Sequence, residues 1–193
     1  MAATHEATTA PVGDEHADGP PQHRGRYLRF GAMIFVSMIV MYGVMFLNTY
    51  QLDHVEFSET RFFMTLLMGA TMTVIMLGFM WSMHPDRRIN IGILAVAAVV
   101  FTGALWLVRS QITVDDNAYM RGMIPHHSIA ILTSENAQLD DVRVRALADG
   151  IIASQCREIA EMKWLIDDIN DHGTARSTED AANRPVPDFP DTC

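Results

Sequence analysis

Three uninterrupted apolar stretches constrain this chain more than any other feature of its sequence. They cover residues 30 to about 52, 62 to about 83, and 89–108, and charged residues flank each of them. Each stretch reaches or exceeds the roughly 20 apolar residues that a helix needs to cross the hydrocarbon core of a bilayer. Soluble proteins rarely bury three such helices in succession. We therefore predict a three-helix transmembrane region over residues 27–110, with the lipid bilayer as its partner.

The basic residues around these stretches predict an orientation. Three arginines precede the first stretch, and Arg87 and Arg88 lie between the second and the third. The segment 51–60, between the first and second stretches, is acidic. The positive-inside rule then places the N-terminus in the cytoplasm and everything after the third stretch outside. We expect a three-pass protein of a bacterial inner (plasma) membrane, with residues 1–26 as a disordered cytoplasmic tail rich in small and polar residues.

Two amphipathic helices are predicted after the transmembrane region, within residues 111–172. The first begins at Asp115 or Asp116, which are suitable N-caps, and contains Pro125, where a kink is expected. The second begins near residue 140, carries apolar residues on one face and stops at Gly173. Because only a few residues connect them, the two helices should form an antiparallel hairpin outside the cell. The tail 173–193 is expected to be disordered.

Charge and cysteine content exclude two functional classes. The chain is 49% hydrophobic but carries a net charge of −9, and no basic stripe is available to contact nucleic-acid phosphates. The cysteines Cys156 and Cys193 have none of the short spacings that are typical of zinc sites. A disulfide between them stays open, but we expect Cys193 to be mobile because it ends a proline-rich tail.

The sequence around the first predicted helix suggests a metal site. Met120 and Met123 are followed closely by His126 and His127. Thioether sulfur suits Cu(I), and imidazole suits copper, zinc and iron, so a copper ion is the leading cofactor and other transition metals are possible. On a helix, Met120, Met123 and His127 share one stripe, whereas His126 lies about 100° away.

The second helix would supply further residues to this site. If the turn lies near residue 139, Met120 falls level with Glu158, and Met123 falls level with Gln155. Gln155, Glu158 and Met162 share the inward face of that helix, where polar groups are costly unless they are paired or bind something. In the alternative interpretation all of these residues only pack, and Glu158 pairs with Arg121.

The segment from Met123 to Ile131, together with Gln155-x-x-Glu158-Ile159-x-x-Met162, resembles the family called domain of unknown function 305. The resemblance covers residues 115–169. It implies a ferritin-like fold, a membrane anchor and Cu(I) binding through methionine and histidine. A usual member has two hairpins and this chain has one, so a homodimer is expected. The metal-binding residues implied directly are Met123, His126, His127 and Met162, with Met120, Gln155 and Glu158 as further ligands or supporting residues.

Together these features predict an all-α protein in which three transmembrane helices precede an extracytoplasmic helical hairpin, half of a ferritin-like bundle. The predicted function is copper binding for metal homeostasis or resistance, without catalysis. Three alternatives stay open: a copper permease, a metal-dependent redox enzyme, and a structural module that binds no metal. The permease would use methionines spaced four residues apart in the second stretch, from Met64 to Met80. Whether His54 and Glu56, from the outer loop, join the site is also open.

Overall fold

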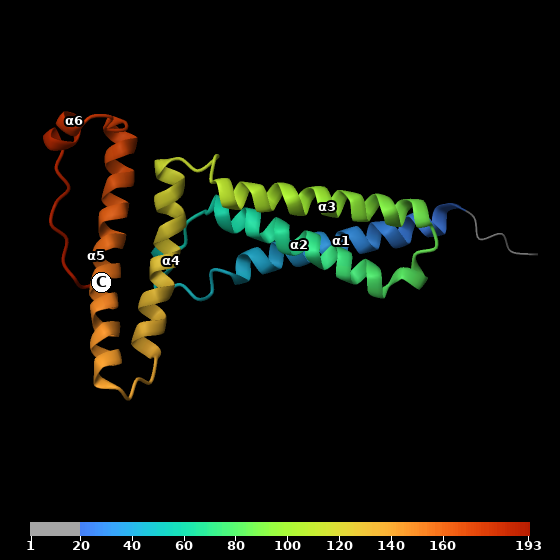
Figure 1. Cartoon of the computed structure of the whole chain (residues 1–193), viewed down its shortest axis with the longest axis horizontal. Coiled ribbons are helices and arrows are strands. Elements are labelled where there is room, and N and C mark those ends of the chain that lie inside the picture. Colours follow the sequence, from blue (N-terminus) through green and yellow to red (C-terminus); the bar gives the residue numbers. More distant parts are fainter. Residues whose placement is uncertain (1–19) are drawn as a thin grey trace, which may run out of the picture.

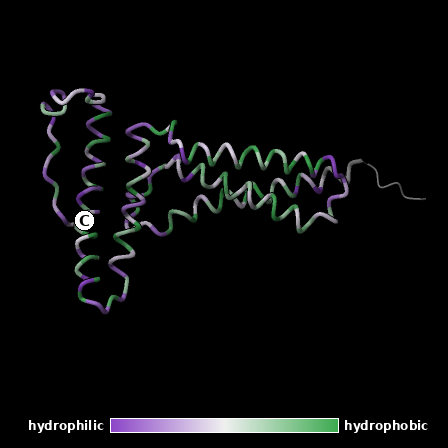
Figure 2. Tube along the Cα trace, in the orientation of Figure 1, coloured by the Kyte–Doolittle hydropathy of each residue, from purple (hydrophilic) through white to green (hydrophobic). Residues whose placement is uncertain are grey.

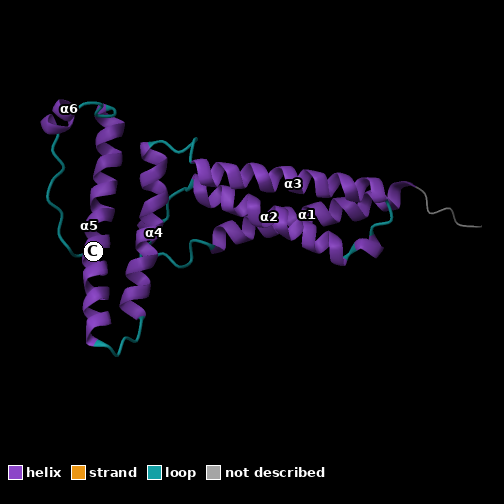
Figure 3. Cartoon of the chain, in the orientation of Figure 1, coloured by secondary structure: helices purple, strands orange, loops and turns teal. Residues whose placement is uncertain are grey.

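The computed structural model describes residues 20–193, and their side chains from residue 25 onward. Most of the tail predicted to be disordered therefore lies outside the described residues. Over the described range the chain is helical, with no strand, as predicted (Figure 3). Its elements are α1 (Pro20–Val44), η1 (Leu52–His54), α2 (Glu59–Phe79), η2 (Trp81–Met83), α3 (Arg87–Ser110), α4 (Asp116–Asn136), α5 (Val142–His172) and α6 (Thr178–Asn183).

Helices α1, α2 and α3 are each long and apolar enough to cross a membrane. Hydrophobic residues recur along all three (Figure 2), and many of the large ones are exposed. The first helix differs from the prediction at both ends. It begins at Pro20, before the apolar stretch, and it ends at Val44 although the stretch continues to about residue 52. The residues after Val44 leave the helix and instead contact α4.

Helix α2 is the centre of this bundle, since it contacts both α1 and α3. Its small residues allow a close approach. Gly69 is buried, and a Cβ atom at this position would overlap the Sδ of Met38 on α1. Several of the regularly spaced methionines on α2, including Met72 and Met76, pack against a buried cluster formed by Phe30, Ile34 and Leu77.

Helices α4 and α5 lie side by side and crosswise to the bundle at one of its ends (Figure 1). The predicted start and stop signals are confirmed. The Asp115 side chain accepts a hydrogen bond of 2.7 Å from the Ala118 amide at the start of α4. Asp141 caps α5 in the same way, and Gly173 ends it with a φ of 79°. Pro125 lies buried inside α4, and the helix continues through it.

The loop between α1 and α2, residues 45–58, rests on the α4–α5 pair. Ser128 of α4 is completely buried, and its Oγ lies 2.7 Å from the Tyr50 amide and 2.9 Å from Nδ1 of His54. Two ion pairs flank this contact: Asp53 with Lys163 at 2.6 Å and Glu56 with Arg121 at 3.2 Å. The loop therefore joins the helical bundle to the α4–α5 pair.

The tail 173–193 is a correction to the sequence analysis. It contains α6 and then runs back along α5, where Cys193 forms a disulfide with Cys156 (Figure 1). Two ion pairs attach the tail to α5: Arg184 with Asp168 at 2.6 Å and Asp191 with Arg157 at 2.7 Å. Composition predicted disorder because the tail has few apolar residues, but it is held by charge pairs and a covalent bond. We call residues 173–193 the C-terminal strap.

Candidate functional site

A pocket of about 420 Å³ opens between α4 and α5. Its walls include most of the residues that the sequence analysis singled out, brought together from both helices: Met120, Met123, His127, Glu158 and Met162. Met120 and Met162 are buried, whereas Met123, His127 and Glu158 are half-buried. The packing of the two helices therefore brings three methionines and one histidine to a single cavity. We call it the thioether pocket.

Two of the predicted site residues do not line this pocket. His126 is exposed and points to a different cavity, next to α2. The rotation of about 100° between neighbouring helical residues explains why it separates from His127. Gln155 is half-buried on α5 but is also absent from the pocket walls.

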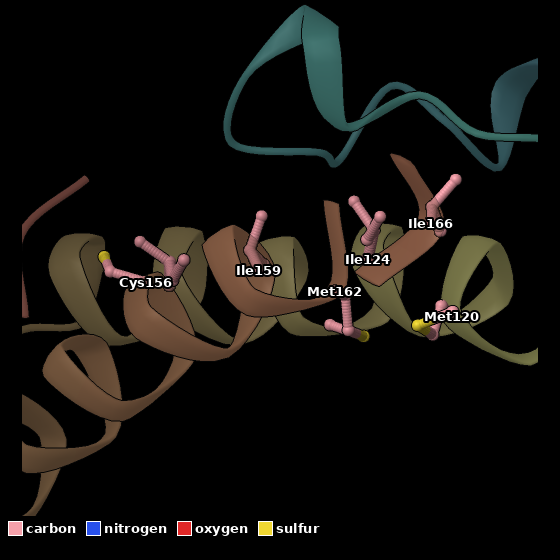
Figure 4. Close-up of a cluster of buried hydrophobic side chains, with 7 residues drawn as sticks. Met120, Ile124, Cys156, Ile159, Met162 and Ile166 are labelled. Atoms are coloured by element: carbon pink, nitrogen blue, oxygen red, sulfur yellow. The ribbon is translucent and has the colours of Figure 1, made fainter. Parts of the chain in front are cut away.

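The α4–α5 pair has two different faces, and the pocket lies on only one of them. Ile124 and Ile166 point toward the loop 45–58, whereas the sulfur atoms of Met120 and Met162 lie on the side away from that loop (Figure 4). Neither His54 nor Glu56 lines the thioether pocket, although both residues contact α4. The loop 45–58 therefore contacts the face of the α4–α5 pair opposite the pocket and does not cover the pocket.

His127 and Glu158 form the polar part of the pocket. The imidazole Nδ1 lies 3.0 Å from a carboxylate oxygen of Glu158, but the contact lacks hydrogen-bond geometry and leaves Nδ1 without a hydrogen-bond partner among the described residues. Burial lowers the pKa of His127 below its ordinary value of 6.5, and the neighbouring Glu158 carboxylate opposes this shift. Burial is the larger effect, so the imidazole is neutral at pH 7 and has a lone pair available for a ligand.

The alternative pairing of Glu158 with an arginine is not observed. Arg121, the nearest arginine on α4, pairs with Glu56 of the loop instead. Glu158 accepts a hydrogen bond of 2.7 Å from the Ser154 hydroxyl, one turn earlier on the same helix. This bond orients the carboxylate beside His127.

Sequence reasoning missed several residues of the pocket wall. Asp116 and Glu161 add carboxylates, and Tyr119, Leu165 and Ile169 add apolar surface. Helical spacing offered a signal, because Glu161 and Leu165 lie three residues after Glu158 and Met162. The carboxylates make the pocket attractive to a cation.

The donor atoms of the pocket define the kind of metal that would fit. Within residues 25–193, no group of three or more histidine, cysteine, aspartate and glutamate side chains is arranged to hold a metal ion. The donor side chains on the pocket wall are three thioethers, one neutral imidazole and the carboxylates of Asp116, Glu158 and Glu161. Mg²⁺ and Ca²⁺ take oxygen ligands, whereas the thioethers and the imidazole suit a soft ion such as Cu(I).

These features define a class: an all-helical protein with three helices able to span a membrane and a further helical pair that carries a thioether-lined pocket. Residues 110–187 match the family described as "Domain of unknown function (DUF305)". The chain is also similar to the uncharacterized protein L153 of Acanthamoeba polyphaga mimivirus, with 31% identity over 144 residues, covering 71% of this chain and 93% of that protein. No solved structure matches the chain. The chain belongs to the DUF305 family, as its helical motifs predicted.

Proposed function

We propose that this protein is a membrane-anchored Cu(I)-binding protein that serves copper homeostasis or resistance. One observation carries the proposal: the side chains of Met120, Met123, Met162 and His127 line one pocket between α4 and α5. The helices α1–α3 are the anchor, and α4 and α5 form the binding unit, half of a ferritin-like bundle. The protein needs no catalytic group for this function.

Pocket chemistry supports a soft monovalent ion. Thioethers bind metal without losing a proton, and Cu(I) is the common biological ion that favours them. The neutral state of His127 removes the proton that would compete with the metal. Glu158 places a carboxylate oxygen 3.0 Å from Nδ1 of this ring and so adds negative charge beside it. Asp116 and Glu161 add negative charge that attracts the cation.

Two independent features support a location of α4 and α5 on the outer side of a bacterial inner membrane. The arginines before α1 and between α2 and α3 favour a cytoplasmic N-terminus. The Cys156–Cys193 disulfide lies on the α4–α5 side, and disulfides persist in oxidising compartments such as the periplasm. Thioether ligands suit the same compartment, since free thiols would oxidise there.

We further propose that two copies associate through the open face of the α4–α5 pair. This face carries the thioether pocket and is not covered by the loop 45–58. A ferritin-like bundle requires four helices, and two copies would supply them. Light scattering of the detergent-solubilised protein, corrected for bound detergent, should give the mass of a dimer; a monomer at all concentrations would contradict this proposal.

The central experiment is a Cu(I) competition titration against a colorimetric chelator, with full-length protein in detergent. The test variant is Met120→Leu/Met162→Leu, which removes two sulfur atoms and nearly conserves side-chain volume. The matched control is Met72→Leu/Met76→Leu, which removes two sulfur atoms from α2. We expect wild type and the control to bind Cu(I) equally, and the test variant to bind at least 10-fold more weakly while remaining helical.

The same titration separates the alternatives. If only the α2 variant lost Cu(I), the permease hypothesis would replace ours. If both variants bound like wild type, the methionines would only pack, as the structural hypothesis holds. Copper-dependent oxidase activity of the loaded wild-type protein would favour the redox enzyme, for which Glu158, Glu161 and Asp116 would then be the carboxylates to test.

A further inference from the structure

A second pocket, of about 300 Å³, lies at the junction between the helical bundle and α4. It is a different cavity from the thioether pocket, and Tyr119 and Met123 form part of the wall of both. Its polar lining comes from three segments: the start of α2, the residue that follows α3, and the exposed side of α4. The polar lining residues are Ser58, Thr60, Arg61, Gln111 and His126. We call this cavity the junction pocket.

Arg61 is the principal charged residue of the junction pocket, and its guanidinium has no carboxylate partner among the described side chains. The guanidinium is half-buried, donates a hydrogen bond of 2.9 Å to the Met45 carbonyl, and lies 4.7 Å from the centre of the Phe46 ring. Among the side chains that the structure describes, no carboxylate lies within ion-pair distance of it. Glu59, two residues earlier, does not line the pocket. A partly desolvated cation without a counter-ion favours the binding of an anion.

His126 places a second basic group in the same cavity. It belongs to the histidine pair of α4 but does not reach the thioether pocket. Two hydroxyls lie beside it at the start of α2. The Ser58 hydroxyl is only 2% exposed and accepts a hydrogen bond from the Arg61 amide, and the Thr60 hydroxyl donates to the Gln111 side chain. Gly122 allows this assembly, because a Cβ there would lie only 3.2 Å from the Ser58 Oγ.

The position of the pocket favours a phospholipid headgroup as the source of the anion. Ser58 is the residue before α2, and Gln111 is the residue after α3, so the cavity lies where two helices able to span a membrane end. Phospholipid headgroups occupy this level of a bilayer. The remaining wall residues include Val114 and Ala118, which are apolar. Contact with the apolar part of a lipid would remove this surface from water.

We propose that the junction pocket binds the phosphate of an anionic phospholipid headgroup, held by Arg61 and His126. Arginine suits this role because its planar guanidinium offers several N–H groups to phosphate oxygens. A bound headgroup would link the end of α2 to α4 and so fix the α4–α5 pair against the membrane surface. The inference is independent of copper binding, and either can fail alone.

The test measures thermal unfolding of the full-length protein in uncharged detergent. The additions are phosphatidylglycerol, phosphatidylcholine or inorganic phosphate at equal concentrations. Phosphatidylglycerol well above its dissociation constant should raise the unfolding temperature of the wild type by roughly 5 °C. The rise should be at least halved in Arg61→Gln and in His126→Gln. Arg109→Gln, which removes an exposed arginine at the end of α3 outside the pocket, should respond like wild type.

Two outcomes would overturn the proposal. An equal response to inorganic phosphate would mean that the pocket takes a free anion. A full response to phosphatidylglycerol in His126→Gln would show that the lipid acts elsewhere; because His126 is exposed, this variant should fold even if Arg61→Gln does not. Phosphatidylcholine, whose headgroup carries a compensating cation, should raise the unfolding temperature less than phosphatidylglycerol.

Discussion

Single residues decide how the loop 45–58 holds α4. The Ser128 Oγ accepts a hydrogen bond from the Tyr50 N–H and forms a second hydrogen bond, of 2.9 Å, with Nδ1 of His54. His54 is 3% exposed and is therefore held as a neutral imidazole. Burial lowers its pKa below 6.5, the Lys163 ammonium lowers it further, and the Asp53 carboxylate opposes both. Nothing in the sequence pointed to Ser128, because a serine within a helix carries no signal of a partner in a distant loop.

A pH prediction follows from His54. Because its pKa is lower in the folded state, the unfolded chain binds more protons between the folded pKa and 6.5. The contribution of the neutral His54 to the free energy of unfolding should therefore be fully present above pH 6.5 and should decrease as the pH drops below that value. We expect His54→Gln to lose less stability than wild type between pH 7.5 and 5.5, measured by thermal unfolding in detergent.

The exposed His172 provides the control for this measurement. His172→Gln should keep the wild-type pH dependence. Some dependence should also remain in His54→Gln, since burial lowers the pKa of His127 as well. An unchanged loss of stability in His54→Gln would show that His54 does not carry this effect.

At the scale of elements, the contact between α1 and α2 depends on Gly69. The helices approach so closely that Met38 occupies the space of a side chain at this position. Small residues permit such contacts in membranes, where helices gain little from hydrophobic burial and rely on packing. Nothing in the sequence identified Met38 as the residue that packs against Gly69.

Gly69→Leu should therefore destabilise the bundle by about 1–3 kcal/mol, the usual cost of overpacking. Gly78→Leu is the matched control on the same helix, because no atom lies within 4 Å of a Cβ there; it should be nearly neutral. Adding Met38→Ala to Gly69→Leu should recover part of the loss. Denaturant unfolding in mixed micelles measures all three, and additive effects of the two substitutions would contradict a direct contact between these positions.

On the scale of the whole molecule, the α4–α5 pair is held crosswise at the end of the bundle rather than continuing its direction (Figure 1). The loop 45–58 fixes it from one side through the ion pairs of Asp53 and Glu56. The C-terminal strap fixes α5 from the other side through the Cys156–Cys193 disulfide. Both connections join residues far apart in the chain, so neither follows from local sequence.

The disulfide of the C-terminal strap can be tested by limited proteolysis. Trypsin should cut after Arg176, at the exposed start of the strap, but the peptide 177–193 should stay attached until a reductant is added. Mass spectrometry before and after reduction measures this. Release of the peptide without reductant would exclude the disulfide. Cys193→Ser should release it at once and should lower stability by about 2–4 kcal/mol, the usual effect of a disulfide.

The proposed orientation is tested with reporter fusions in a bacterial host. Alkaline phosphatase, which is active only outside the cytoplasm, should be active when fused after Cys193 and inactive when fused after Asp86, between α2 and α3. The reverse pattern would move the α4–α5 pair into the cytoplasm, and the support that the oxidising compartment gives to copper binding would be lost.

The chain's periodicity and composition were sufficient for three apolar helices, for the capped limits of α4 and α5, and for the methionine and histidine stripes, since these depend on near neighbours along the chain. They were insufficient for the end of α1 at Val44, for the ordered strap and for the cavities that His126 and His127 line. Each of these depends on a partner from a distant segment: Ser128 for the loop, Cys156 for the strap, and α2 and α5 for the two histidines. A hydrogen bond, a disulfide or a pocket wall across such separations forms only when the helices pack, so tertiary contacts settle those features.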